Sequence, residues 1–173
     1  MSDFVIDTNV AVVADRRGPS NTTEGCILAA IAALRRVQES DRLVLDAGGR
    51  ILAEYTENVR TAGQPGPDQR FLRWVHRHQY NEQRCVRVAI HVRGDGGEDY
   101  EEFPDAADLT DFDRSDRKFV AVALARGPVT PIIQATDAEW WRRRHALASA
   151  GVRIEFICPD DIQRSHRALL NTR

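Results

Sequence analysis

The sequence predicts an α/β protein of three layers, in which helices cover both faces of a mostly parallel central sheet. Short apolar segments alternate along the chain with longer segments whose apolar residues recur at helical spacing. Strands that alternate with helices are joined by right-handed crossovers, which produce parallel sheets. The chain has 173 residues, a usual size for one domain. We therefore expect a single domain over residues 1–173.

The strand candidates are short runs of branched and aliphatic residues that end in acidic or turn-forming residues. FVID (4–7) is the first, and RLVLD (42–46) is the second. Apolar residues alternate with other residues over 86–92, which predicts a half-exposed strand, either at an edge of the sheet or in an accessory element. Two further strands are expected at 131–135 and 152–157.

Helices are predicted where apolar residues recur every three or four positions. The segment Asn21-Thr-Thr-Glu24 has the form of a capping box, so we expect a helix from there to about residue 39. A second helix follows the strand at 42–46 and carries Ile51 and Tyr55 on its inner side. Further helices are expected at about 70–80, 114–126 and 138–149, and from about 160.

Residues 93–112 are predicted to form a long acidic loop inserted into the domain. This stretch is rich in Gly and Asp and has no helical or strand periodicity. Long loops without regular structure are often mobile. We expect it to be the least core-like part of the chain.

The bulk composition limits the classes of partner. The chain has 24 Lys and Arg against 26 Asp and Glu, so nucleic-acid binding would depend on local basic patches. Cys26, Cys85 and Cys158 show no metal-ligand spacing, and we interpret them as reduced thiols of a soluble cytoplasmic protein. There is no leader-like segment and no apolar run of about 20 residues, so no membrane contact is expected.

Four acids are predicted to converge at one crevice. In an open parallel sheet this crevice lies beyond the carboxyl ends of the strands. Asp7 and Asp137 each follow a predicted strand directly. Asp116 heads the apolar stripe of the helix at 114–126, and Glu54 lies at the edge of the apolar face of an earlier helix.

Each acid also has a structural interpretation. Asp7 and Asp137 are suitable helix N-caps, Asp116 is a suitable first-turn acid behind a cap at Asp113, and Glu54 is an ordinary helix glutamate. Capping is the commoner role for any one of them, but it does not explain why acids from four segments meet. Carboxylates without His or Cys favour Mg²⁺ or Mn²⁺, and such a site supports phosphodiester hydrolysis.

The blocks FVIDTNV, AEYTENV, DRKFVAVALA and ATDAEWW resemble, in order and approximate spacing, the PIN-domain family of metal-dependent nucleases. Many VapC-like toxins of bacterial toxin-antitoxin pairs belong to this family. The resemblance implies an endoribonuclease that cuts single-stranded RNA with Mg²⁺ or Mn²⁺. It implies four catalytic metal ligands, Asp7, Glu54, Asp116 and Asp137, and three supporting residues, Thr8, Asn9 and Thr136. The resemblance also implies two kinds of partner, a cognate antitoxin protein and a second copy of the chain in a homodimer.

A basic and aromatic cluster directly follows Asp137 in WWRRRH, residues 140–145. Arginines neutralise phosphates, and aromatic rings stack on unpaired bases. We predict substrate contacts from Trp140, Arg142 and Arg143. The structural alternative is a solvated helix face that a tryptophan anchors to the core.

Three other functions agree with the same residues. One is a non-catalytic PIN-like module that binds RNA or a protein, and another is a DNA-cleaving nuclease of the same fold. A third is a phosphotransfer domain in which Asp7 accepts phosphate. Such domains carry a lysine after a later strand, whereas the only lysine of this chain, Lys118, lies within a predicted helix.

Overall fold

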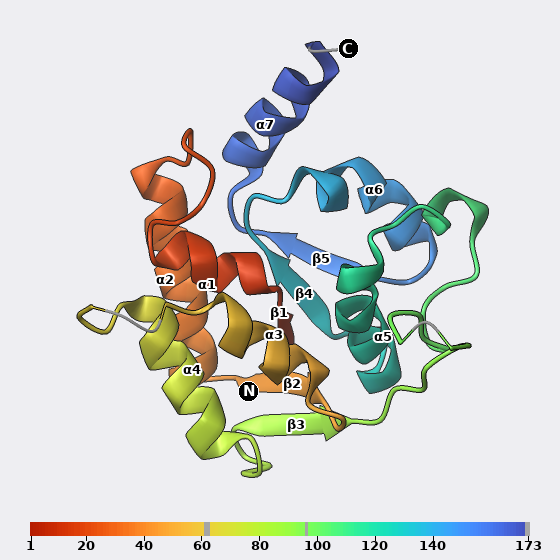
Figure 1. Ribbon diagram of the computed structural model, residues 1–173, viewed down its shortest axis with the longest axis horizontal. Coiled ribbons are helices and arrows are strands. Elements are labelled where there is room, and N and C mark those ends of the chain that lie inside the picture. The colour runs from red at the N-terminus through yellow and green to blue at the C-terminus, as the bar shows by residue number, and fades with distance from the viewer. Residues whose placement is uncertain (61–62, 96, 172–173) are drawn as a thin grey trace.

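The computed structural model contains a five-stranded sheet in which every neighbouring pair of strands is parallel (Figure 1). The structure describes residues 1–60, 63–95 and 97–171. The strand order is β3-β2-β1-β4-β5. The strands are β1 (Asp3–Ile6), β2 (Arg42–Asp46), β3 (Cys85–Val88), β4 (Pro131–Gln134) and β5 (Arg153–Phe156). The predicted α/β class with a mostly parallel sheet is confirmed.

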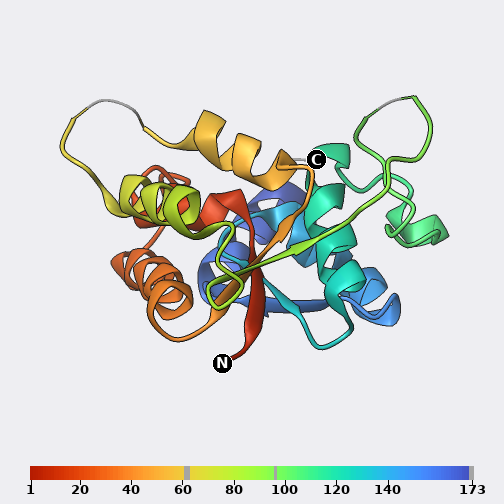
Figure 2. The same ribbon diagram turned by 90° about the horizontal axis from the view of Figure 1, so that it is seen from below.

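Helices cover both faces of this sheet and complete three layers. Helices α1, α2 and α4 pack together on one side, and α5 and α6 lie on the other (Figures 1 and 2). The helices of the described residues are α1 (Thr8–Ala14), α2 (Glu24–Glu39), α3 (Arg50–Asn58), α4 (Pro67–His78), α5 (Arg117–Arg126), α6 (Ala138–Ser149) and α7 (Pro159–Asn171). Two short 3₁₀ turns, η1 (Ala107–Leu109) and η2 (Arg114–Asp116), precede α5.

The sheet has a topological switch point at β1. The chain adds β2 and β3 on one side of β1 and then returns to place β4 and β5 on the other side. At such a point the crossovers leave the sheet over opposite faces, which opens a crevice at the carboxyl ends of the two central strands. Asp7 follows β1 and Asp137 lies just beyond β4, so both begin their helices at this crevice.

Two helix starts differ from the sequence prediction. The sequence does not predict α1, because its segment VAVVA is rich in β-branched residues with modest helix propensity. The helix starts there because the Asp7 carboxylate accepts a hydrogen bond from Asn9 N (2.8 Å). The N-cap of α2 is Thr23, whose hydroxyl accepts from Cys26 N, so the predicted cap at Asn21 is two residues early.

The alternating segment at 86–92 contributes an edge strand. Only Cys85–Val88 joins the sheet, where β3 pairs with β2. Farther along, Val92 forms an isolated antiparallel bridge with Tyr100. The alternation therefore identified a strand but extended it too far.

The expectation that residues 93–112 are the least core-like part of the chain is wrong. This segment places four large side chains in the core, each no more than 3% exposed: Tyr100, Phe103, Leu109 and Phe112. The ring of Phe112 packs edge-on against Trp140 of α6, with the ring centroids 5.1 Å apart. The sequence hides this role because the four side chains follow neither the helical nor the strand period.

The expectation of three reduced thiols is also wrong. Cys26, at the start of α2, and Cys158, just before α7, form a disulfide with their Cα atoms 5.2 Å apart. Cys85 is a buried free thiol, and burial raises its pKa to about 12. Disulfides are typical of oxidising compartments, so the cysteines do not support the prediction of a cytoplasmic protein.

The described part of the chain forms no helix that is both long enough and apolar enough to cross a membrane.

Candidate functional site

The crevice at the switch point brings together the acid quartet, which we define as Asp7, Glu54, Asp116 and Asp137. Asp7 and Asp137 cap helices, as their structural interpretation requires. One oxygen of Asp7 accepts from Asn9 N, and one oxygen of Asp137 accepts from Glu139 N (2.8 Å). Capping is compatible with cation binding, because the cap hydrogen bond uses one oxygen of each carboxylate. The same bond orients the second oxygen.

Asp116 lies at the junction of η2 and α5, and its neighbour Asp113 is the cap. Asp113 accepts hydrogen bonds from Ser115 N (2.9 Å) and from the Ser115 hydroxyl. The Asp116 side chain caps no helix; its Oδ2 accepts from the indole Nε1 of Trp140 (3.1 Å). The helical phase of the sequence distinguishes these two acids correctly.

Glu54 on α3 is held at both carboxylate oxygens. Its Oε1 accepts a hydrogen bond from the Thr8 hydroxyl (2.5 Å), and its Oε2 forms an ion pair with Lys118 Nζ. Lys118 also donates to the backbone oxygen of Ser115. The ammonium is therefore held between α3 and the start of α5, with its residue only 8% exposed.

The predicted supporting residues have different roles. Thr8 orients an acid of the quartet, as described above. The Asn9 side chain instead fastens β4 to α1, because its Oδ1 accepts from Ala135 N (3.1 Å) and its Nδ2 donates to Gln134 Oε1. Thr136 is buried in the short connection between β4 and Asp137.

The electrostatics of the quartet are those of carboxylates that face one another. The pKa of Asp7 is raised well above its usual value, first by burial and next by the charge of Asp116. Burial and then the charge of Asp137 raise the pKa of Asp116 to about 7. Burial also raises the pKa of Asp137, against the hydrogen bond from Glu139 N, which lowers it. Burial is the first cause of all three shifts, and the charge of neighbouring carboxylates adds to it.

The fit of the quartet to a divalent cation depends on its donor atoms, its charge and its arrangement. Among the described residues, no group of three or more His, Cys, Asp and Glu side chains is already arranged to hold a metal ion. The donor chemistry nevertheless fits Mg²⁺ or Mn²⁺, because the quartet offers carboxylate oxygens alone. When all four acids are ionised, the ion pair with Lys118 offsets one of their charges, and a divalent cation would offset two more. The quartet fits in composition and charge, but its geometry is not preassembled.

The predicted stacking role of Trp140 does not agree with its position. The side chain is fully buried, and its indole N–H is engaged by Asp116. Arg142 and Arg143 both form ion pairs with Glu139, and Arg143 Nη1 also donates to the backbone oxygen of Asp108 (2.8 Å). Trp140 therefore positions an acid of the quartet. Substrate contacts from the two arginines stay a prediction.

Lys118 is the residue that sequence reasoning missed. It is two residues from Asp116, and the only lysine in a chain that otherwise uses arginine. The sequence shows that this lysine is unique, but it does not show the ion pair with Glu54, which is more than 60 residues away on another helix.

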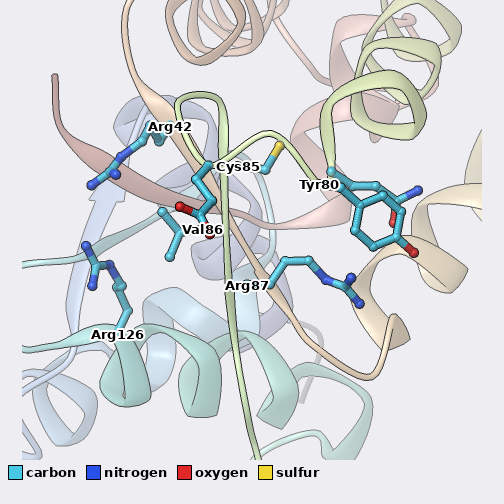
Figure 3. Close-up of a pocket in the computed structure, with 8 residues that line it drawn as sticks. Arg42, Tyr80, Cys85, Val86, Arg87 and Arg126 are labelled. Atoms are coloured by element: carbon cyan, nitrogen blue, oxygen red, sulfur yellow. The ribbon is translucent and has the colours of Figure 1, made fainter.

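Another cavity, of about 320 Å³, lies at the amino-terminal ends of β2 and β3, and no member of the quartet lines it (Figure 3). Arg42 and Arg126 both line it, and both form ion pairs with Asp3 (2.7 Å). The Arg87 guanidinium lies over the Tyr80 ring, 4.7 Å from its centroid. Protein groups already satisfy these cations.

Comparisons of the chain with protein-family models, with curated proteins and with solved structures find no match. The resemblance to the PIN-domain family therefore stays a prediction.

Proposed function

We propose that the protein is a metal-dependent nuclease of PIN type that hydrolyses phosphodiester bonds of single-stranded RNA. The observation that carries the proposal is the convergence of four acids from four separate segments at the switch point, where burial and acidic neighbours raise the pKa of Asp116 to about 7. A fold gains no stability from gathering carboxylates in this way. Raised pKa values in a crevice are typical of functional sites.

Asp7, Asp116 and Asp137, with Glu54, would hold the cation. A bound Mg²⁺ or Mn²⁺ supplies Lewis-acid activation of water and offsets charge on a phosphate. The chain's own contribution is orientation: the backbone N–H of Asn9 fixes Asp7, and the indole of Trp140 fixes Asp116. Thr8 fixes Glu54 in the same way. These contacts hold the acids at defined angles before substrate arrives.

The test is cleavage of a single-stranded RNA with Mn²⁺ and its arrest by EDTA. We expect Asp7→Asn and Asp116→Asn to lower the cleavage rate by about a hundredfold or more while the protein stays folded. Asp111→Asn is the matched control, because it changes an exposed acid five residues from Asp116. Asp113 is unsuitable, since its charge contributes to the raised pKa of Asp116. Unchanged cleavage in both site variants would refute the assignment. The same assay on single-stranded DNA separates the two substrate classes.

One observation favours a second candidate, a non-catalytic module that binds RNA or a protein at the same crevice. Glu54 is paired with Lys118, so one of the four acids is already neutralised by the protein. Under this alternative the protein would bind nucleic acid or a partner without hydrolysis at any Mn²⁺ concentration. An antitoxin and a homodimer stay predictions that co-purification and light scattering can test.

A further inference from the structure

A polar cavity of about 600 Å³ opens beside the acid quartet. Three segments that are distant in sequence form its walls: α3, the start of α5, and the segment at 97–100. Glu54 and Lys118 line this cavity, and Glu54 is also a member of the quartet. The cavity is therefore continuous with the proposed site, and a chain bound at the acids has room to extend into it.

Two cationic side chains from different elements face this cavity. Lys118 lies at its buried end, and Arg50, the first residue of α3, lies at its exposed side. Arg50 Nη1 donates to the backbone oxygen of Gly97 (3.0 Å), and its guanidinium lies over the Tyr100 ring, 5.8 Å from the centroid. These two contacts orient the guanidinium. They leave further N–H donors available, because a guanidinium has five.

The segment at 93–112 has a defined part in this arrangement. Tyr100 is 2% exposed and fixes the segment to the core, and Asp99 pairs with Arg117 of α5 (3.0 Å). The carbonyl of Gly97 is thereby held where it can orient Arg50. Part of the predicted insertion, residues 97–100, thus builds one wall of the cavity.

Two acids, Glu57 and Glu98, also line the cavity, and both are exposed. Exposed charges are screened by water and salt, so the repulsion between these two acids and a phosphate is weak at a distance. A guanidinium in direct contact with a phosphate forms charge-assisted hydrogen bonds, which screening does not remove.

We propose that this cavity binds a backbone phosphate of a single-stranded nucleic acid, next to the bond that the quartet cleaves, through Arg50, whose guanidinium forms no ion pair within the described residues. The proposal rests on the nuclease function proposed above. It adds the place where the bound nucleic acid continues beyond the cleaved bond. The volume of about 600 Å³ lies within the usual range of small-ligand pockets, about 300–1,000 Å³, so one nucleotide fits and a duplex does not. A guanidinium and an ammonium are the usual protein partners of phosphate.

The test is the fluorescence anisotropy of a labelled single-stranded RNA in EDTA, where binding is measured without cleavage. We expect Arg50→Gln to raise the dissociation constant about tenfold and to lower the slope of its salt dependence by about one. Arg35→Gln is the matched control, since it removes the same charge from an exposed position on α2 that does not line the cavity. Arg50 carries the test because it is exposed and its replacement leaves no buried charge unpaired.

Unchanged affinity and salt dependence in Arg50→Gln would overturn the cavity assignment. Equal affinity for a duplex of the same length would overturn the selection of single strands, and parallel measurements on single-stranded DNA define the sugar preference. The two proposals fail separately. If RNA is cleaved and Arg50→Gln binds like the wild type, the nuclease stands and the cavity assignment falls. If Arg50→Gln weakens binding but no RNA is cleaved with Mn²⁺, the cavity assignment stands and the nuclease falls.

Discussion

Asp68 and Asp7 are both almost inaccessible to solvent, at 0% and 4% exposure, yet their carboxylates have opposite surroundings. Asp68, in the first turn of α4, accepts from Arg17 Nη2 (2.8 Å) and from Arg60 N (3.2 Å). Asp7 also has a backbone donor, but burial and three further carboxylates, Asp116, Asp137 and Glu54, raise its pKa. One carboxylate is paired with a cation, and the other adds to negative charge that is already present.

The difference shows that burial of an acid does not by itself indicate a functional site. Asp46 and Asp161 are buried like Asp68, and each is satisfied by donors: Asp46 by two backbone N–H groups of α3, and Asp161 by Thr23 and Arg164. These acids connect elements of the fold. In the quartet, Asp7, Asp116 and Asp137 instead form no ion pair within the described residues, and their pKa values are raised. A bound cation or a proton relieves the cost of burying such charges.

The largest expected change in stability concerns Asp68, the acid that is paired with a cation. Asp68→Ala removes the acceptor of Arg17 Nη2 and of two backbone N–H groups, those of Arg60 and Gln69. Arg17 keeps its ion pair with Asp15 (3.1 Å), so the lost hydrogen bonds dominate, and we expect a loss of about 3 kcal/mol in the free energy of unfolding. Asp7→Asn removes a repelled charge and should leave stability unchanged or raised. Urea denaturation of both variants measures this contrast. Equal losses in the two would show that the carboxylates are energetically alike.

The next effect is the dependence of stability on pH without metal. The pKa of Asp116 is about 7 in the folded protein, above its unfolded value of about 4, so the folded state binds more protons between these values. Stability should therefore rise by about 2–3 kcal/mol as the pH falls from about 7.5 to about 5. Asp116→Asn should weaken this dependence. Urea titrations in EDTA provide the measurement, and a wild-type protein that loses stability over this range would contradict it.

A smaller effect is expected from added metal. A cation that binds only the folded quartet, at about thirtyfold above its dissociation constant, raises the free energy of unfolding by about 2 kcal/mol. Thermal unfolding with and without Mn²⁺ at neutral pH tests this, with EDTA as the reversal. Asp116→Asn should lose most of the gain, whereas Asp111→Asn should retain it. An identical gain in both variants would place the metal elsewhere.

The smallest effect concerns Asp46, which accepts from Arg50 N and Ile51 N (2.8 Å each) at the start of α3. Asn keeps one acceptor oxygen, so Asp46→Asn should cost about 1 kcal/mol, as other helix caps do. Chemical denaturation of the variant and of the wild type checks this expectation.

Sequence reasoning located the acids that local rules control. Asp7 and Asp137 are at strand ends, where the topology alone dictates that they meet, and helical phase distinguishes Asp116 from Asp113. It failed where the outcome depends on tertiary contacts. The direction of Trp140 is set by packing on Phe112, and the Lys118–Glu54 ion pair joins two helices.

The same limit applies to the fold. The alternation of elements predicts the parallel sheet, since crossover rules act on the order of elements. The disulfide joins cysteines 132 residues apart, and no local pattern announces such a pairing. The segment at 93–112 contributes to the core through four isolated side chains, which periodicity cannot detect.

The single lysine has a practical consequence. Apart from its terminal amine, the chain offers amine-directed reagents one target, Lys118, and in this structure Glu54 holds the ammonium in a position that is 8% exposed. Any event that draws Glu54 away releases this amine. The rate at which Lys118 Nζ is acylated, followed by peptide mass spectrometry, therefore measures how often its contact with Glu54 opens. The measurement needs neither a substrate nor a change of sequence.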